Sequence, residues 1–122
     1  MTENCEYTII SACATARMDD IANLNSEEVF TVREIDELKK YHKQTSLGFF
    51  TVKEALIKLI SQEYPDVVVG KKEIEISHEK SGKPILVSYP EKYFYMSPSI
   101  SITHTGETAF AIVAASKWEA KE

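Results

Sequence analysis

The alternation of hydrophobic and polar positions divides the chain into a first apolar strand, two helical segments and four further strands. Residues 7–16 are apolar and rich in small or β-branched side chains, which predicts a buried first strand. Residues 19–24 are expected to form a short helical turn. Thr31 and Glu34 have the spacing of a capping box, which predicts a helix that continues to about His42. Its expected inward-facing side chains are Val32, Ile35, Leu38 and Tyr41.

A second helix is predicted to follow Gly48, because residues 45–48 interrupt the helical period. This helix is expected to end near Tyr64, since Pro65 cannot continue it. Its apolar stripe consists of Phe49, Val52, Leu56, Leu59 and Ile60.

The remaining pattern predicts a hairpin followed by two core strands. Residues 72–77 alternate like a half-exposed strand, and residues 85–89 form its return strand after a turn. Residues 90–98 are expected to be irregular, and residues 117–122 to be a polar tail. The two core strands are residues 99–103 and 108–116, joined at Gly106. Helices and strands segregated in this order predict an α+β fold, with the helices packed on one side of a mostly antiparallel sheet.

Composition and charge limit the class of protein. The chain has 122 residues, of which 43% are hydrophobic and 27% charged, values typical of one globular domain over residues 1–122. Its net charge of -5 disfavours general binding to nucleic acids or anionic membranes. No apolar run is long enough to cross a membrane. A group of cations is either a local basic patch or a solvated helix face: Arg33, Lys39, Lys40, His42 and Lys43.

The two cysteines indicate a reducing environment. Cys5 and Cys13 lack the spacing of a metal site, and on one strand they could not reach each other. We therefore expect free, buried thiols. The N-terminus has no basic segment typical of a signal peptide, so a cytoplasmic location is expected.

Three short motifs contain the side chains best suited to chemistry on phosphates. Glu54 offers the hard oxygen that magnesium prefers, and Lys58 shares its helix face one turn later. Lys83 follows Gly82 in a turn, where backbone and ammonium groups can meet a phosphate. Four residues near the end of a predicted strand can donate hydrogen bonds: Ser101, Thr103, His104 and Thr105. Each motif also has an ordinary explanation, namely a helix ion pair, a hairpin turn and a strand-end histidine.

Together, and in this order, these motifs resemble the 4'-phosphopantetheinyl transferase superfamily, in its short holo-acyl-carrier-protein synthase type. Residues 50–58 match the motif phenylalanine-x-x-lysine-glutamate-alanine-x-x-lysine. Residues 82–84 match the glycine-lysine-proline turn, and residues 101–105 match the serine-isoleucine-serine-histidine-threonine strand with Thr103 in place of a serine. Phe30-Thr31, followed by Arg33-Glu34, is similar to the family's helix start.

The resemblance implies a function and a set of site residues. The implied reaction is magnesium-dependent transfer of 4'-phosphopantetheine from coenzyme A to a serine of an acyl or peptidyl carrier protein, as in fatty acid biosynthesis. Glu54 would be the metal ligand and act with Lys58 in catalysis. Coenzyme A would be bound by Lys53, Lys83, Ser101, Thr103, His104 and Thr105. The resemblance also implies a homotrimer with sites between subunits, so that Glu54 and His104 of one site come from different chains.

Some positions depart from the family pattern. The family's first strand ends in a glycine-x-aspartate-isoleucine motif whose aspartate binds metal, and Ala14 stands at that position. Asp19 or Asp20 would replace it only if the strand were shifted in register. Phe49 stands where the family often has an arginine, just before the helix motif. Of the basic residues with which the family binds the carrier after the first strand, only Arg17 is present. These departures favour an alternative, a catalytically impaired homologue that binds coenzyme A or a carrier domain as an interaction module.

Overall fold

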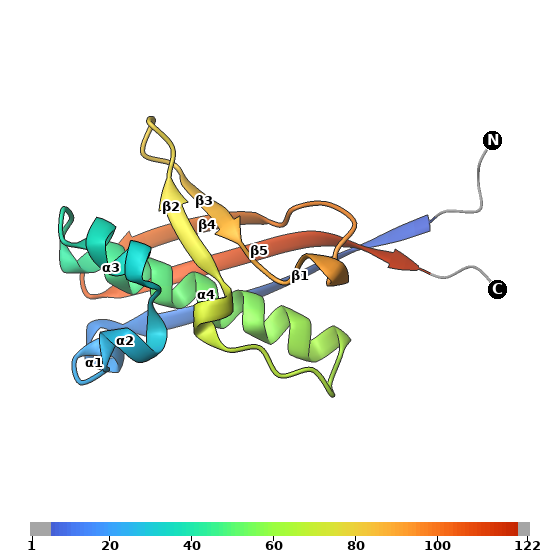
Figure 1. Ribbon diagram of the computed structural model, residues 1–122, viewed down its shortest axis with the longest axis horizontal. Helices are drawn as coiled ribbons and strands as arrows, with labels where there is room; N and C mark the ends of the chain where they lie inside the picture. The colour runs from blue at the N-terminus through green and yellow to red at the C-terminus, as the bar shows by residue number, and fades with distance from the viewer. Residues whose placement is uncertain (1–5, 120–122) are drawn as a thin grey trace.

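A three-stranded sheet and one long helix form the framework of the protein (Figure 1). The computed structural model describes the backbone of residues 6–119 and the side chains of residues 8–117. The antiparallel sheet has the order β1 (Glu6–Arg17), β5 (Thr108–Glu119) and β4 (Ser99–Thr105). Helix α4 (Lys43–Glu63) packs along one face of this sheet. The predicted α+β fold, with a helix on a mostly antiparallel sheet, is therefore confirmed.

Short helices and a hairpin complete the fold around α4. The antiparallel hairpin joins β2 (Glu75–His78) to β3 (Pro84–Ser88), as predicted. Gly82 and Gly106 have φ of 92° and 58° in the two hairpin turns, a backbone region that favours glycine. The remaining elements are α1 (Met18–Ile21), α2 (Ser26–Val29), α3 (Val32–Leu38) and the 3-10 turns η1 (Lys71–Glu73) and η2 (Glu91–Tyr93).

The core lies between α4 and the sheet, as the apolar stripe predicted. Every member of that stripe is buried: Phe49, Val52, Leu56, Leu59 and Ile60. The facing positions of β5 are small or β-branched, namely Ala109, Ala111, Val113 and Ala115. Small side chains at these positions let the helix approach the sheet closely.

Several boundaries differ from the sequence prediction. Helix α4 begins at Lys43, so residues 45–48 continue the helix, because Leu47 is fully buried on the same side as the stripe. Helix α3 ends at Leu38, and Val32 and Tyr41 are 83% and 45% exposed rather than inward-facing. Residues 71–73 form a 3-10 turn instead of a strand, and β5 continues over residues 117–119 of the expected tail.

The first strand is buried on one face only. Along β1, Ala12, Ala14 and Ala16 face α4, whereas the alternate side chains within residues 9–17 are exposed, as expected for a sheet with one covered face. The thiol of Cys13 is free, as predicted, but it is exposed rather than buried. Cys5 lies outside the described residues.

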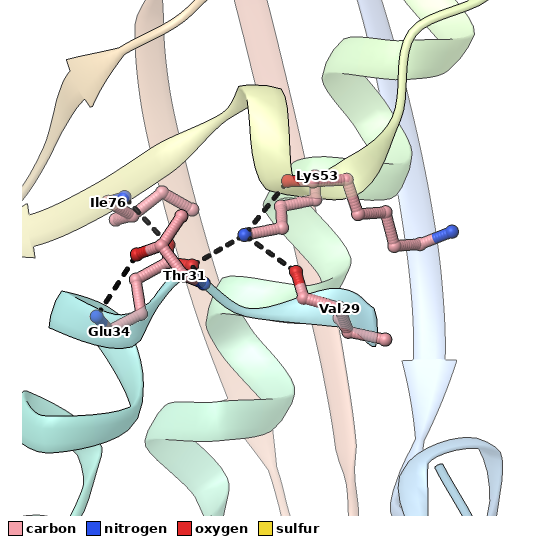
Figure 2. Close-up of polar contacts among 6 residues, drawn as sticks. Val29, Thr31, Glu34, Lys53 and Ile76 are labelled. Carbon is pink, nitrogen blue, oxygen red and sulfur yellow. Dashed lines mark hydrogen bonds and ion pairs between the residues drawn. The ribbon is translucent and has the colours of Figure 1, made fainter. Parts of the chain in front are cut away.

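A buried ammonium connects α4 to the short helices (Figure 2). Lys53 has no exposed surface, and its Nζ donates hydrogen bonds to Oε1 of Glu34 at 2.6 Å. It also donates to the backbone carbonyls of Val29 at 2.9 Å and Lys71 at 3.0 Å. Three acceptors therefore satisfy the three donors of this ammonium.

The carboxylate of Glu34 is equally well satisfied. The backbone N–H of Thr31 donates to its Oε1 at 2.9 Å, which is the predicted capping box, and the N–H of Ile76 donates to its Oε2 at 2.8 Å. Burial lowers the pKa of Lys53, while the hydrogen bond and charge of Glu34 oppose that shift. The pair thus links α3, α4 and β2 at the centre of the protein.

Within the part of the chain that the structure describes, no helix is long and apolar enough to cross a membrane.

Replacing Lys53 with methionine should destabilise the protein strongly. Lys53→Met leaves the buried carboxylate of Glu34 without its cation, which costs about 3–5 kcal/mol for a buried pair. Urea unfolding would measure this loss. The exposed neighbour gives the matched control, because Lys72→Met should change the free energy of unfolding by less than about 0.5 kcal/mol. Equal stability of the two variants would contradict a stabilising role for the pair.

Candidate functional site

The face of α4 that carries Glu54 and Lys58, here called the motif face, meets β1 at the position where an acid was expected. Nζ of Lys58 donates a hydrogen bond to the backbone carbonyl of Cys13 at 3.3 Å, and the next residue, Ala14, packs against the core. The β1–β5 register is regular through this region, with Ala14 opposite Ala111. Ala14 therefore lies close to Lys58, without a register shift.

The two acids that follow β1 have other positions. Asp19 and Asp20 belong to the exposed helix α1, where Oδ2 of Asp20 accepts a hydrogen bond from the backbone N–H of Arg17 at 2.8 Å. Capping this short helix occupies Asp20. The register shift that would bring either acid to the position of Ala14 does not occur.

Glu54 is paired with a residue that the sequence did not single out. Nζ of Lys71 lies 2.8 Å from Oε2 of Glu54, and both side chains are partly exposed. The ammonium of Lys71 also lies 5.6 Å from the ring centre of Phe50. In the described part of the chain, the ion pair of Glu54 is thus to Lys71 and not to Lys58. No local pattern indicates this pair, because Lys71 is 17 positions from Glu54 and lies just before the predicted strand of residues 72–77.

Lys53 has a different position from the one expected of a ligand-binding residue. Its side chain is 0% exposed and its donors are occupied by protein acceptors. Direct contact with coenzyme A would require breaking the buried pair with Glu34. The geometry therefore corrects that expectation and makes Lys53 a structural residue that precedes Glu54.

His104 and its hydroxyl neighbours lie on opposite faces of β4. His104 faces α4, where a Cβ built on Gly48 would lie 3.1 Å from its Cε1, a tight contact that glycine avoids. Ser101, Thr103 and Thr105 alternate with it and are exposed on the other face. Within one chain, the strand motif is therefore divided between two surfaces.

Lys83 lies apart from both of these regions. It is exposed in the β2–β3 turn, and it lines a cavity of about 330 Å³ between β3 and the start of β4. Ser99 and Ile100 line the same cavity. Apart from the buried Lys53, the predicted residues thus occupy four places: Glu54 with Lys58, His104 beside Gly48, the three hydroxyl residues on the other face of β4, and Lys83 beside the start of β4.

A further polar cluster joins α3 to the hairpin. Oε2 of Glu37 lies 2.9 Å from Nδ1 of His78, and Oγ of Ser77 donates to its Oε1 at 2.8 Å. The ring of His78 also packs against Tyr41 and Phe49, with centroid distances of 4.8 Å and 5.3 Å. The sequence indicated only a turn at His78, since pairing across 41 positions leaves no local pattern.

The cations of the candidate basic patch point in different directions. Arg33 and Lys40 line a cavity of about 470 Å³ next to His78, together with Lys80 of the hairpin turn. Lys43 instead lines a cavity on the other side, beside α1. The structure therefore divides the predicted patch, and Arg33 is paired with Glu75 at 3.3 Å.

Among the residues that the structure describes, the side chains around Glu54 offer few ligands for a divalent cation. No group of three or more His, Cys, Asp or Glu residues within the described ranges is arranged to hold a metal ion. Glu54 provides one carboxylate, and an ammonium is already paired with it. Magnesium usually takes one or two carboxylates together with substrate phosphates. Glu54 alone meets the lower limit of one carboxylate, and the ammonium of Lys71 already neutralises its charge.

The fold is similar to that of solved holo-acyl-carrier-protein synthases. A complex of ACPS with CoA from Chronobacterium ammoniagenes has a TM-score of 0.76 and 20% identity, covering 92% of this chain and 98% of that one. The holo-(acyl-carrier-protein) synthase from Bacillus anthracis in complex with CoA (3',5'-ADP) has a TM-score of 0.73 and 23% identity, covering 90% and 99%. The Helicobacter pylori synthase in complex with coenzyme A has a TM-score of 0.66 and 25% identity, covering 87% and 99%.

A family model settles the membership that the motifs suggested. The model of the 4'-phosphopantetheinyl transferase superfamily matches residues 12–113. The chain belongs to this superfamily, which confirms the family identified from the sequence. No curated protein gives a significant match.

The Glu37 cluster predicts a loss of stability in acid. Burial raises the pKa of Glu37, but the hydrogen bonds from His78 and Ser77 and the charges of His78 and Lys40 together hold it below its usual value of 4.5. A carboxyl group with a lowered pKa in the folded state stabilises the fold above its unfolded pKa. That contribution is lost as the pH falls through the lower, folded value.

Urea unfolding from neutral pH down to about pH 3 would measure this dependence. Glu37→Gln should flatten the loss of stability below pH 4.5, whereas Glu91→Gln, at an exposed position, should leave it unchanged. A wild-type acid dependence that Glu37→Gln preserves in full would contradict the prediction.

Proposed function

We propose that the protein transfers 4'-phosphopantetheine from coenzyme A to a serine of an acyl or peptidyl carrier protein. The serine oxygen forms a bond to the phosphorus that carries the pantetheine arm, and the bond from that phosphorus to 3',5'-ADP breaks. The serine proton passes to a base, and 3',5'-ADP leaves with the electron pair. The observation that supports this proposal best is the position of the motif face of α4 against β1, in a chain of this superfamily.

The roles of the α4 residues follow from their positions. Lys58 is exposed beside Glu54, and its contact to the carbonyl of Cys13 holds the ammonium close to β1. An ammonium there can stabilise charge on the diphosphate in the transition state. Glu54, with its partly exposed carboxylate, is suited to orient the reacting groups or to accept a proton. Lys83 and His104 are proposed to bind the nucleotide part of coenzyme A.

The separation of the site residues supports a site shared between subunits. The ring of His104 lies next to Gly48, which precedes Glu54 by six residues on α4. Six residues correspond to about 9 Å along the helix axis. The uncovered face of the sheet contains Ile9, Cys13, Phe110 and Ile112. Its large apolar side chains are exposed, Ile9 to 66%, Phe110 to 39% and Ile112 to 43%. We propose that this face joins copies of the chain into a trimer, so that His104 of one subunit completes the Glu54 site of another.

Two observations favour a second candidate function. Ala14 replaces an acid, and the carboxylate of Glu54 is already paired with Lys71. Both fit a homologue that binds coenzyme A or a carrier domain without transferring the arm. The two candidates differ in their product, since only the transferase releases 3',5'-ADP.

The transfer assay separates these candidates. The protein is incubated with coenzyme A and purified carriers from fatty-acid, polyketide and nonribosomal-peptide systems, and each carrier is weighed by mass spectrometry. We expect one phosphopantetheine group on at least one carrier, and a rate about a hundredfold lower for Lys58→Met. Lys92→Met removes an exposed charge elsewhere and should retain the wild-type rate. Binding of coenzyme A without modification of any carrier would favour the second candidate.

A charge on the uncovered face should dissociate the trimer. Ile112→Asp places a carboxylate where an apolar contact is proposed, so light scattering should give the mass of a monomer. Its affinity for coenzyme A should fall as well, because His104 would come from the neighbouring subunit. Val68→Asp, at a position 91% exposed away from the sheet, is the control. A monomeric wild type, or an unchanged mass for Ile112→Asp, would contradict the shared site.

A further inference from the structure

We propose that the ammonium of Lys71, and not a divalent metal ion, is the cation that binds the diphosphate of coenzyme A beside Glu54. The inference rests on the proposed function, and it assigns a role to a residue that no motif contains. It starts from the ion pair of 2.8 Å between Nζ of Lys71 and Oε2 of Glu54.

Lys71 is held against α4 at both ends. Its backbone carbonyl accepts a hydrogen bond from the buried Nζ of Lys53 at 3.0 Å, which ties η1 to the helix. Its ammonium reaches Glu54, the residue after Lys53, and lies over the ring of Phe50. Few side-chain conformations remain for a lysine anchored in this way, so its charge is already positioned before any ligand binds.

The local charge favours a phosphate over a metal ion. Glu54 contributes one negative charge, whereas Lys58 and Lys71 contribute two positive charges. Ala14 adds no charge at the position where a second carboxylate was expected. The region therefore attracts a diphosphate and repels a divalent cation. The neighbouring pair of Lys53 and Glu34 is buried and internally compensated, so it leaves this balance unchanged.

The ion pair of Lys71 can be exchanged for a contact to a ligand. The side chains of Lys71 and Glu54 are 28% and 42% exposed, and pairs in contact with solvent contribute little stability. A diphosphate offers several charged oxygens where Glu54 offers one carboxylate. A diphosphate can therefore take the place of the Glu54 carboxylate beside the ammonium at little cost, which frees the carboxylate for the carrier serine.

Calorimetry of coenzyme A binding tests the proposal, first in a chelator and then in millimolar magnesium. The wild type should bind with the same affinity, within about twofold, in both solutions. Lys71→Met keeps an unbranched side chain of similar length and removes the charge, so binding in the chelator should weaken about tenfold or more. Magnesium should partly restore binding to this variant, because its Glu54 is no longer paired.

Two further variants make the outcome specific. Lys72→Met removes the same charge from the exposed neighbouring position and should bind like the wild type. Glu54→Gln frees the ammonium of Lys71, so metal-free binding should be retained or become tighter. If Glu54 were instead a metal ligand, Glu54→Gln would bind coenzyme A more weakly than the wild type in magnesium. Unfolding curves of all variants would verify that each is folded.

The failures of the two proposals are distinguishable. Wild-type binding that weakens more than about tenfold in the chelator would overturn the role of Lys71 and leave the proposed function standing. Equal binding by Lys71→Met and Lys72→Met would overturn it as well. No binding of coenzyme A by the folded wild type under either condition would overturn the proposed function itself.

Discussion

The buried ion pair of Lys53 and Glu34 holds the short helices and the hairpin in place around α4. Both side chains are 0% exposed. Burying an ammonium and a carboxylate costs free energy unless nearly every donor and acceptor of the pair has a partner. Four backbone groups meet that requirement beyond the pair itself: the carbonyls of Val29 in α2 and Lys71 in η1, and the N–H groups of Thr31 before α3 and Ile76 in β2 (Figure 2). These elements pack at fixed positions relative to α4 because a shift of any of them would leave a buried charge without a partner.

The buried pair also positions two residues of the candidate site, Glu54 and Lys71. Glu54 directly follows Lys53 on α4, and Lys71 is both an acceptor for the buried ammonium and the ion-pair partner of Glu54. One buried lysine thereby sets the position of a carboxylate and of a second, accessible ammonium. The family motif places lysine and glutamate next to each other, and in this chain the lysine is buried whereas the glutamate is partly exposed.

The sheet contributes a different constraint, because it separates the side chains of one strand into two surfaces. His104 faces the helix side, while Ser101, Thr103 and Thr105 face the uncovered side. A single chain therefore divides the residues of the strand motif between two surfaces. In the proposed trimer, the apolar side chains of the uncovered face are removed from water.

The sequence by itself determined the elements whose patterns are local. It identified the apolar stripe of α4, the β2–β3 hairpin, the capping box at Thr31 and the family motifs, because periodicity and turn chemistry act over a few residues. It misplaced the start of α4 and the inward face of α3, where burial of Leu47 and Glu34 overrides local preference. Only the tertiary structure decided that Lys53 is buried, that Glu54 pairs with Lys71 and that His104 rests on Gly48. These contacts join residues 17 to 56 positions apart, and the energy of a charge depends on which distant groups surround it after folding.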